Sequence, residues 1–398
     1  MTTAASAQNL LVVSDFDGTL AGFSIDATDV PVNARSLAAL TRLAGMPSTH
    51  VAVLSGRHLE GLMQVCHLRA PIAFAGSHGN ESSVAGEPTP EQQEALDFVD
   101  RQLAEILDEP GAFVERKPFQ RVAHVFRLAM QDPARAEELL ALAAKIDPGA
   151  THMTAGKQIL EFSATDVNKG TWLAGERDRV GADVTVFLGD DVTDENGFRV
   201  LGGSDVGIKV GEGETLAGER VAGVEEVSDW LTQLADDRAR HLGFPRDTRD
   251  RFEWVAAGFS SVAFQVTDWD AASPCEGWAA RDVVDHLATW FPQAIGAEAV
   301  TGEPLEQWFG LVELVRENLD ANEKLIRSVL VTDIFLHTWD LATSQGLAAP
   351  LDEGFAASLL RAFESADLSA DGKFAEPVKV AEDATVVERL IAQSGRRS

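Results

Sequence analysis

The amino-terminal half of the chain alternates between short, continuously apolar runs and longer amphipathic stretches. Continuous apolar runs are typical of strands in a parallel sheet, because helices cover such a sheet on both faces. The pattern therefore predicts an α/β fold with a doubly wound parallel sheet. We expect its strands at residues 9–14, 50–54, 72–75, 184–188 and 205–210. We expect its helices at residues 33–44, 58–66, 168–180, 192–200 and 226–236.

Residues 82–163 follow a different pattern. Apolar and polar residues alternate more strictly there, as in antiparallel strands with one buried face. We predict that this segment is an inserted α+β cap, and that residues 1–81 and 164–238 form the core. The cap strands are expected at residues 112–116, 121–128, 151–155 and 158–163, and its helices at residues 91–107 and 133–146.

The last third of the chain is predicted to be helical. A charged stretch at residues 234–252, which contains Gly243 and Pro245, interrupts the apolar rhythm and predicts a domain boundary. Beyond it, apolar residues recur three and four positions apart, so residues 247–398 are expected to form an all-α helical bundle. Its helices are expected at residues 247–265, 280–300, 305–330, 331–344 and 352–366.

Composition limits the partners of this chain. It has 63 acidic and 33 basic residues and a formal net charge of -30, whereas nucleic acids and anionic membranes attract basic proteins. We therefore expect neither as a partner. Its two cysteines are far apart, the first residues lack the features of a signal peptide, and no apolar run is long enough to cross a membrane. These features predict a cytoplasmic protein, and they make no prediction of its oligomeric state.

Acidic residues follow two of the predicted strands. Asp15 and Asp17 come after strand 9–14, where both side chains can point the same way. Strand 184–188 is also followed by acids, and the carboxyl ends of parallel strands share one edge of a sheet. Carboxylates that lie together need a shared proton or a cation, and Mg²⁺ prefers oxygen ligands and phosphate. The candidate Mg²⁺ ligands are Asp15 and Asp17 after the first strand and Asp190, Asp191, Asp194 and Glu195 after the second.

Two further segments complete a phosphoryl-transfer site. Ser55 and Arg57 follow strand 50–54, and Lys169 lies at the start of helix 168–180. In this hypothesis Asp15 attacks phosphorus and becomes an aspartyl phosphate, while Asp17 moves the proton. Ser55 and Lys169 stabilise the charge of the transferring group. Taken alone, the run DFDG also fits a turn or a calcium loop, and the acidic run GDDVTDE fits a solvated helix start.

The motifs DFDGTL, LSGR, NKG and GDDVTDE, in this order, resemble the haloacid dehalogenase superfamily of phosphatases. The stretches GSHGNE, VERKPFQRVAH, GKQILEFSATDVNKG and GIKVGEGETLA are similar to the trehalose-6-phosphate phosphatases within it. The resemblance covers residues 9–235 and implies hydrolysis of trehalose 6-phosphate to trehalose and phosphate. It also implies substrate contacts through Arg57, His78, Glu81, Glu115, Lys117, His124 and Glu161.

Two departures from that family lie in the segment that binds the sugar. The family usually has a His-aromatic-Arg run, whereas this chain has HVFR, so that His124 and Arg127 would face opposite sides of a strand. Phe162, Ser163 and Ala164 stand where the family usually has a basic residue and a proline. A phosphatase for another sugar phosphate is therefore the alternative hypothesis.

A second set of candidate metal ligands lies in the helical third. His286 lies within a predicted helix, and Asp333 and His337 are four residues apart, so that they share a helix face. Two histidines and a carboxylate suit Zn²⁺ or another divalent metal with an open position. The alternative is a polar pair at a helix interface beside a core histidine.

The stretches SPCEGWAARDVVDHLATW, DIFLHTWDLATSQG and ERLIAQSGRRS resemble the mycothiol-dependent maleylpyruvate isomerase-like proteins, which are relatives of the DinB-like helical bundle. The resemblance covers residues 247–398 and implies a metal on His286, Asp333 and His337. A thiol-dependent isomerase or transferase activity of this part is therefore a further hypothesis for the main function. A pure interaction protein is the remaining alternative.

Overall fold

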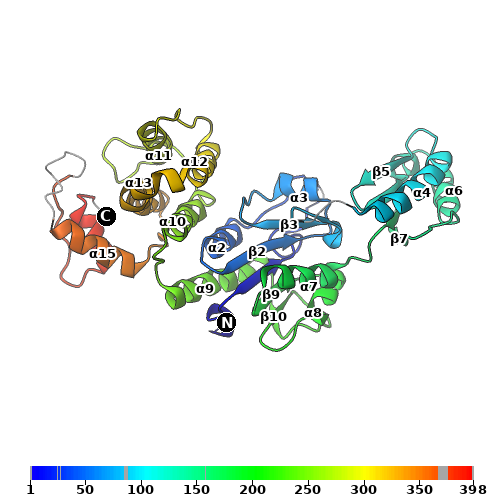
Figure 1. Ribbon diagram of the computed structural model, residues 1–398, viewed down its shortest axis with the longest axis horizontal. Helices are drawn as coiled ribbons and strands as arrows, with labels where there is room; N and C mark the ends of the chain where they lie inside the picture. Colours follow the sequence, from blue (N-terminus) through cyan, green and yellow to red (C-terminus); the bar gives the residue numbers. More distant parts are fainter. Residues whose placement is uncertain are drawn as a thin grey trace.

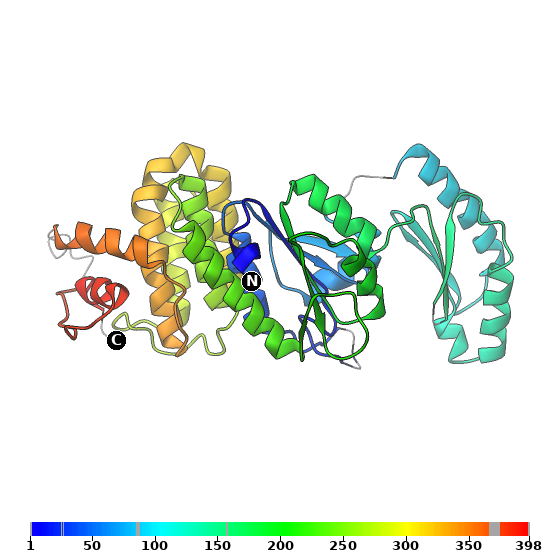
Figure 2. The ribbon, with the colours of Figure 1, turned by 90° about the horizontal axis from the view of Figure 1, so that it is seen from below.

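A computed structural model shows the chain as three parts in a row, with the predicted cap at one end and the helical part at the other (Figure 1; Figure 2). The amino terminus lies at the central part. The structure describes residues 2–24, 26, 28–84, 88–156, 158–365 and 375–396. Within these ranges no helix is both long and apolar enough to span a membrane.

The central part contains a seven-stranded sheet with the strand order β11-β10-β9-β1-β2-β3-β4. Neighbouring strands are parallel except β3 and β4. The predicted α/β fold with a parallel sheet is therefore confirmed; β4 and β11 are too short to give a sequence pattern. The strands are β1 (Leu10–Ser14), β2 (Thr49–Leu54), β3 (Ala73–Gly76), β4 (Glu81–Ser82), β9 (Val184–Gly189), β10 (Val206–Val210) and β11 (Glu219–Val221).

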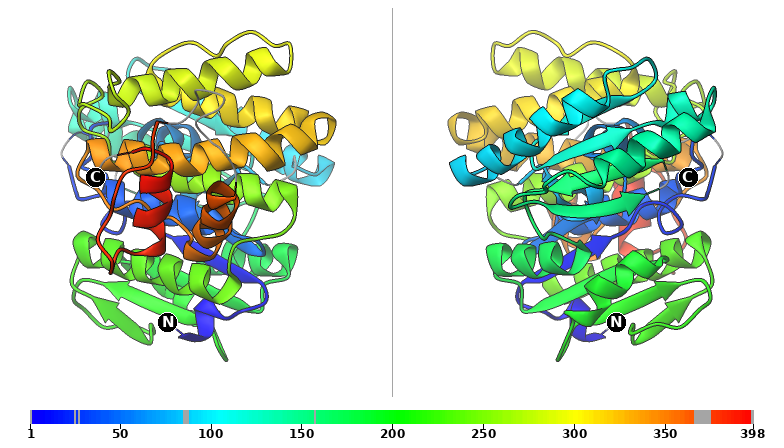
Figure 3. Two further views of the ribbon diagram at one scale, coloured as in Figure 1. Left: turned by 90° about the vertical axis from the view of Figure 1, so that its left-hand side faces the viewer. Right: turned by 90° about the vertical axis from the view of Figure 1, so that its right-hand side faces the viewer.

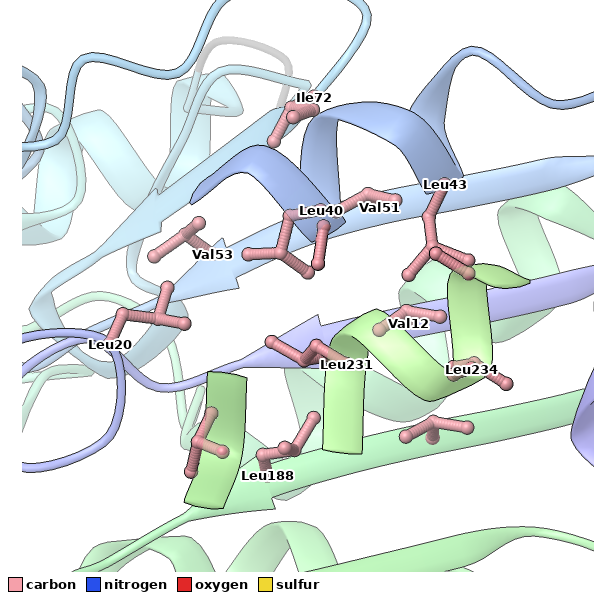
Figure 4. Close-up of a cluster of buried hydrophobic side chains, with 14 of the residues drawn as sticks. Val12, Leu20, Leu40, Leu43, Val51, Val53, Ile72, Leu188, Leu231 and Leu234 are labelled. Carbon is pink, nitrogen blue, oxygen red and sulfur yellow. The ribbon is translucent and has the colours of Figure 1, made fainter. Parts of the chain in front are cut away.

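Helices cover both faces of this sheet, which explains why its strands are continuously apolar. On one face, Val12 of β1 lies in the same buried cluster as Leu40 and Leu231 from two covering helices (Figure 4). On the other face, Leu11 of β1 lies in a cluster with Leu173. The helices of the first face are α2 (Ala34–Ala44), α3 (Leu59–Val65) and α9 (Val224–Leu242), and those of the second are α7 (Lys169–Val180) and α8 (Glu195–Arg199).

Helix α9 is longer than the predicted helix 226–236 and runs into the predicted boundary stretch. It ends at Leu242 because Gly243 has a φ of 64°, which stops a right-handed helix. The extra turns carry Arg238, which is fully buried. Its guanidinium donates hydrogen bonds to the carbonyls of Ala5, Ala7 and Ser48 and to the hydroxyl of Thr49. Burial lowers the pKa of Arg238 to about 10.

Replacing Arg238 with methionine is expected to lower the free energy of unfolding by about 2–3 kcal/mol, because several buried acceptors lose a charged donor. Urea unfolding followed by circular dichroism measures the change. Arg240→Met is the matched control, because Arg240 lies on the same helix and its side chain is 71% exposed. An Arg238→Met protein as stable as this control would show that the buried hydrogen bonds contribute little.

The predicted cap contains a four-stranded antiparallel sheet with the order β5-β6-β8-β7. Helices lie on the outer face of this sheet, where Val99 and Leu139 share a buried cluster with Leu160, and the strands lie on the side facing the core (Figure 2; Figure 3). The elements are β5 (Phe113–Lys117), β6 (Gln120–His124), β7 (His152–Gly156), β8 (Ile159–Ser163), α4 (Pro90–Ile106), α5 (Phe126–Ala129) and α6 (Pro133–Ala143).

The predicted strand 121–128 is wrong beyond residue 124. Residues 126–129 form the short helix α5 instead, and Leu128 packs into the cap cluster. A short apolar run is compatible with either element, so its periodicity could not decide. Arg127 therefore lies on a helix, so it does not face the opposite side of a strand from His124 as predicted.

The last third is helical, as predicted. One buried cluster joins its long helices. Helix α10 also packs on α2. The two approach closely at Gly45, which follows α2, since a Cβ there would lie only 2.3 Å from the Cβ of Ala257. The predicted helix 280–300 is too long, the predicted helix 305–330 is divided into α12, η3, α13 and η4, and α16 was not predicted. The elements are α10 (Thr248–Ala263), α11 (Ala280–Ala294), α12 (Pro304–Asn318), η3 (Asp320–Asn322), α13 (Glu323–Leu325), the π-helical η4 (Ile326–Leu330), α14 (Val331–Ser344), α15 (Glu353–Glu364) and α16 (Val386–Gln393).

Candidate functional site

Three carboxylates meet at the carboxyl edge of the central sheet. Asp15 follows β1, Asp190 follows β9, and Asp194 ends the short helix η2 (Val192–Asp194). One oxygen from each lies within 4.8 Å of the others. The sheet brings them together because β1 and β9 are parallel neighbours, with Ser14 paired to Leu188. Asp15 and Asp194 are buried, so this is an acidic cluster largely shielded from solvent.

A glycine allows the loop after β1 to approach the cluster. Gly18 has a φ of 75°, and a Cβ at this position would lie 2.1 Å from Oδ2 of Asp190. A side chain would therefore be strained and would also collide with the carboxylate. Gly18, the glycine of DFDG, therefore does more than form a turn. It allows this loop to lie directly against Asp190.

Lys169 is the cation of the cluster. It is the first residue of α7, and its Nζ lies 2.9 Å from Oδ1 of Asp15 and 2.7 Å from Oδ1 of Asp194. Burial alone would lower the pKa of Lys169, but the two carboxylates raise it, so the ammonium stays charged. Lys169 pairs with Asp15 and Asp194 but not with Asp190, so the three carboxylates leave an excess of negative charge.

The pKa values of two of these carboxyl groups are raised. Burial raises the pKa of Asp15 well above its ordinary value, although Lys169 opposes this. Burial and the charge of Asp194 also raise the pKa of Asp190. A divalent cation bound by oxygen ligands would neutralise the excess, so the donor set fits Mg²⁺.

Asp17 is separated from this cluster by its own partner. Arg57 donates from Nε to Oδ2 and from Nη2 to Oδ1 of Asp17, both at 2.7 Å. The prediction that the side chains of Asp15 and Asp17 point to the same place therefore needs correction, because Asp15 pairs with Lys169 and Asp17 with Arg57. Two separate cations relieve the repulsion between the neighbouring acids.

The other core residues surround this edge. The buried hydroxyl of Ser55 accepts a hydrogen bond from the backbone N–H of Arg57 at 3.1 Å. His78 has a φ of 58°, its ring lies against Gly56, and burial together with the charge of Lys169 lowers its pKa. Asp191 is exposed and accepts from the N–H of Val192 at 2.6 Å, so it lies outside the three-carboxylate cluster.

The four predicted cap residues share the open face of the cap sheet. Glu115 and Glu161 lie on either side of Val122 in register, and Nε2 of His124 lies 2.7 Å from Oε2 of Glu115. Burial raises the pKa of Glu161. Lys117 occupies the same face of β5, two residues after Glu115.

Lys117 connects the cap to the core. Its Nζ donates to Oγ of Ser77 at 2.9 Å and lies 3.2 Å from Oε1 of Glu81. Oγ of Ser77 also donates a short hydrogen bond to Oε1 of Glu81. The polar face of the cap therefore contacts the rim of the core that carries His78 and Glu81.

Sequence reasoning missed two residues here. Ser77 joins Lys117 to Glu81, and Lys209 of β10 is buried and donates from Nζ to the carbonyl of Asp190. Lys209 could have been predicted from the sequence, because it is a lysine inside the apolar strand VGIKV and a buried charge needs a partner.

The second cluster lies between α11 and α14. Nε2 of His286 is 3.2 Å from Oδ2 of Asp333, and Nε2 of His337 is 3.4 Å from Oδ1 of the same carboxylate. Trp290 donates to Oδ2 of Asp333 at 2.8 Å, and the ring of Trp278 is stacked on that of His337. The three ligand atoms lie within 4.8 Å of one another, so the structure brings the predicted set together.

In this second cluster, unlike the first, histidines share hydrogen bonds with the carboxylate Asp333. Burial alone would lower the pKa of His337, but its hydrogen bonds to Asp333 and Asp340 raise it well above the ordinary value. Burial would raise the pKa of Asp333, but hydrogen bonds from His286 and His337 lower it. Two imidazole nitrogens and one ionised carboxylate are a donor set that fits Zn²⁺.

Comparisons with known proteins concern the amino-terminal part. A family model described as trehalose-phosphatase matches residues 13–220. The trehalose-6-phosphate phosphatase of Escherichia coli is 33% identical over 235 residues, which cover 55% of this chain and 84% of that protein. The trehalose-phosphate phosphatase of Mycobacterium marinum is 34% identical over 218 residues, which cover 51% of this chain and 54% of that protein.

The chain thus spans about half the length of such mycobacterial relatives. Among solved structures, the trehalose-6-phosphate phosphatase of Aspergillus fumigatus is similar with a TM-score of 0.43 and 25% sequence identity. That match covers 59% of this chain and 95% of the fungal chain.

Proposed function

The chain belongs to the trehalose-phosphatase family, and from this we propose that it is a Mg²⁺-dependent phosphatase that hydrolyses trehalose 6-phosphate to trehalose and phosphate. The observation that carries the proposal is the buried cluster of Asp15, Asp190, Asp194 and Lys169 at the carboxyl edge of the sheet. We also propose the division into a core of residues 1–81 and 164–238, a cap of residues 82–163 and a helical part of residues 247–398.

The reaction would use an aspartyl phosphate. Asp15 attacks the phosphorus atom, and the bond between phosphorus and the sugar oxygen breaks. Asp17 gives its proton to that oxygen and then takes a proton from the water that hydrolyses the intermediate. Both carboxylate oxygens of Asp17 accept hydrogen bonds from Arg57, so the pair must open before Asp17 can reach the sugar oxygen. The guanidinium of Arg57 would then contact the substrate.

Asp15 and Asp190, with Asp194 beside them, would hold Mg²⁺, and the ion would neutralise charge on the transferring phosphoryl group. Lys169 would hold Asp15 in position and would also stabilise negative charge on the transferring group. Ser55, at the end of β2, would donate to a phosphoryl oxygen.

The cap would select the sugar. Glu115, Lys117, His124 and Glu161 offer acceptors and donors on one face, and His78 and Glu81 offer more from the rim of the core. Such groups suit a ligand rich in hydroxyls. The altered residues after Glu161 motivate the alternative of another sugar phosphate.

The test is phosphate release by the full-length protein in the presence of Mg²⁺. A panel of trehalose 6-phosphate, sucrose 6-phosphate, glucose 6-phosphate and mannose 6-phosphate separates the hypotheses. We expect the highest kcat/KM with trehalose 6-phosphate and loss of activity when EDTA removes the metal. Equal or better turnover of another sugar phosphate would overturn the substrate assignment.

The role of Glu161 predicts a pH dependence of substrate binding. Its pKa is raised, so its carboxylate becomes protonated at a higher pH than an ordinary glutamate and then loses a charged acceptor for sugar hydroxyls. KM is therefore expected to rise as the pH falls through this pKa. Glu161→Gln should have a KM about ten-fold higher and lack this dependence. The control Glu105→Gln, on the exposed side of α4, should keep the wild-type pH dependence of KM. A wild-type pH dependence of KM in Glu161→Gln would exclude substrate binding by Glu161.

The cluster of His286, Asp333 and His337 supports a second proposal. We propose that residues 247–398 form a DinB-like bundle that binds Zn²⁺ or another divalent metal, with thiol-dependent isomerase or transferase chemistry as the activity to test. Metal analysis of the purified protein should find one equivalent, lost in His337→Ala. A wild-type protein that binds no added zinc would contradict the proposal.

Charge and cysteine chemistry support a further part of the proposal. With a net charge of -30, the protein would act on a small molecule in the cytoplasm rather than on nucleic acid or an anionic membrane. Cys66 and Cys275 are both free, as expected in a reducing compartment.

A further inference from the structure

A second layer of buried charges lies behind His337. Asp340 follows one turn later on α14 and is fully buried. Its Oδ2 lies 2.8 Å from Nδ1 of His337, the ring nitrogen that faces away from Asp333. Nε of Arg396 lies 2.8 and 2.9 Å from the two oxygens of Asp340. The three residues form a chain of contacts from the end of the polypeptide to the candidate metal site.

The order of charges in this chain determines which nitrogen of His337 carries a proton. Asp340 is paired with a guanidinium, so it is ionised and can only accept hydrogen bonds. Nδ1 of His337 must then be the donor. In the neutral ring Nε2 therefore has the free electron pair, and Nε2 faces Asp333 and His286. This is the tautomer that a metal bound between these residues requires.

We propose that Arg396 is a positioning residue of this metal site, and that it acts through Asp340 on the tautomer and orientation of His337. The inference rests on the proposed metal binding of the helical part. It assigns a function to Arg396, which lies in the stretch ERLIAQSGRRS but was not among the predicted site residues.

The structure holds Arg396 in place from several directions. Leu390 and Ile391 of α16 are buried in the same cluster as α14. Gly395 has a φ of 80°, and a Cβ there would lie 2.6 Å from the carbonyl oxygen of Ala375. The side chain of Arg396 is only 10% exposed. Its orientation is therefore fixed by packing, as a positioning residue requires.

Zinc affinity of the full-length protein tests the proposal, measured by competition with a chromophoric chelator. Arg396→Met should bind zinc about 10- to 100-fold more weakly, which is the usual effect of removing such an outer partner. Arg396→Lys, which keeps the charge, should recover part of the affinity. Arg389→Met is the matched control on α16, because Arg389 is exposed and donates to the backbone carbonyl of Glu382 in the preceding loop. Its zinc affinity should equal that of the wild type.

A purely structural ion pair would give a different result. Arg396→Met would then unfold at a lower temperature but bind zinc like the wild type at temperatures where it is folded. If Arg396→Met does not fold, the double variant Arg396→Met/Asp340→Asn removes both charges and avoids an unpaired buried carboxylate. Its zinc affinity should fall by a similar factor. Co²⁺ in place of zinc should also show a changed visible spectrum in these variants.

Two further outcomes separate this inference from the metal proposal. If the wild type binds no zinc, the metal proposal fails and the inference fails with it. If the wild type binds zinc, His337→Ala loses it, and the Arg396 and Asp340 variants bind like the wild type, then the metal site stands and the positioning role of Arg396 is overturned.

Discussion

Asp15→Asn is expected to lower the rate of phosphate release by about 10⁴-fold or more, because the amide cannot form the aspartyl phosphate. The change keeps the shape of the side chain and removes one of the three carboxylates of the cluster, while Lys169 keeps its pair with Asp194. The protein should therefore stay folded and be at least as stable without metal as the wild type. Initial rates with trehalose 6-phosphate and thermal unfolding measure the two effects.

Asp178→Asn is a suitable control for this variant, because Asp178 lies exposed on α7, away from the cluster. It should keep wild-type kinetics. An Asp15→Asn protein with more than a tenth of the wild-type rate would contradict the nucleophilic role of Asp15.

Lys169→Met is expected to combine a loss of activity with a loss of stability. Without the ammonium, Asp15 and Asp194 are buried beside each other without a cation, and breaking such a buried pair typically costs about 3 kcal/mol or more. The rate of phosphate release should fall by about 10²- to 10³-fold, since a charge that stabilises the transferring group is gone. Urea unfolding and initial rates measure these changes.

A second substitution separates the two effects. Lys169→Met/Asp194→Asn removes one of the unpaired charges, so it should recover most of the stability but none of the activity. If the double variant regained activity as well, the role of Lys169 would be structural only. If the single variant kept both activity and stability, the cluster would not depend on its lysine.

Much of the core could be predicted from the sequence because parallel strands are buried on both faces. Their apolar runs are continuous, and acids such as Asp15 and Asp190 directly follow them. Neighbouring parallel strands then bring the acids to one edge. The order of the four motifs along the chain, which resembles that of the haloacid dehalogenase superfamily, was therefore enough to expect Asp15, Asp190 and Lys169 together at the carboxyl edge of the sheet.

Side-chain pairing could not be predicted in the same way. The Asp17–Arg57 pair joins the ends of two strands, and Arg396 reaches Asp340 from 56 residues away. Such contacts depend on tertiary packing, which leaves no local pattern. Helix α5 was missed for another reason, because its few apolar residues fit a strand or a helix equally well.

The fate of the phosphoryl group during turnover tests the nucleophilic role of Asp15 most directly. The full-length protein is mixed with Mg²⁺ and trehalose 6-phosphate labelled in its phosphate, quenched in acid within one turnover, and digested for mass spectrometry. If Asp15 is the nucleophile, a phosphoryl group is expected on the peptide that contains Asp15, and no label is expected in Asp15→Asn. Rapid phosphate release with no label on Asp15, or with the label on another residue, would contradict it.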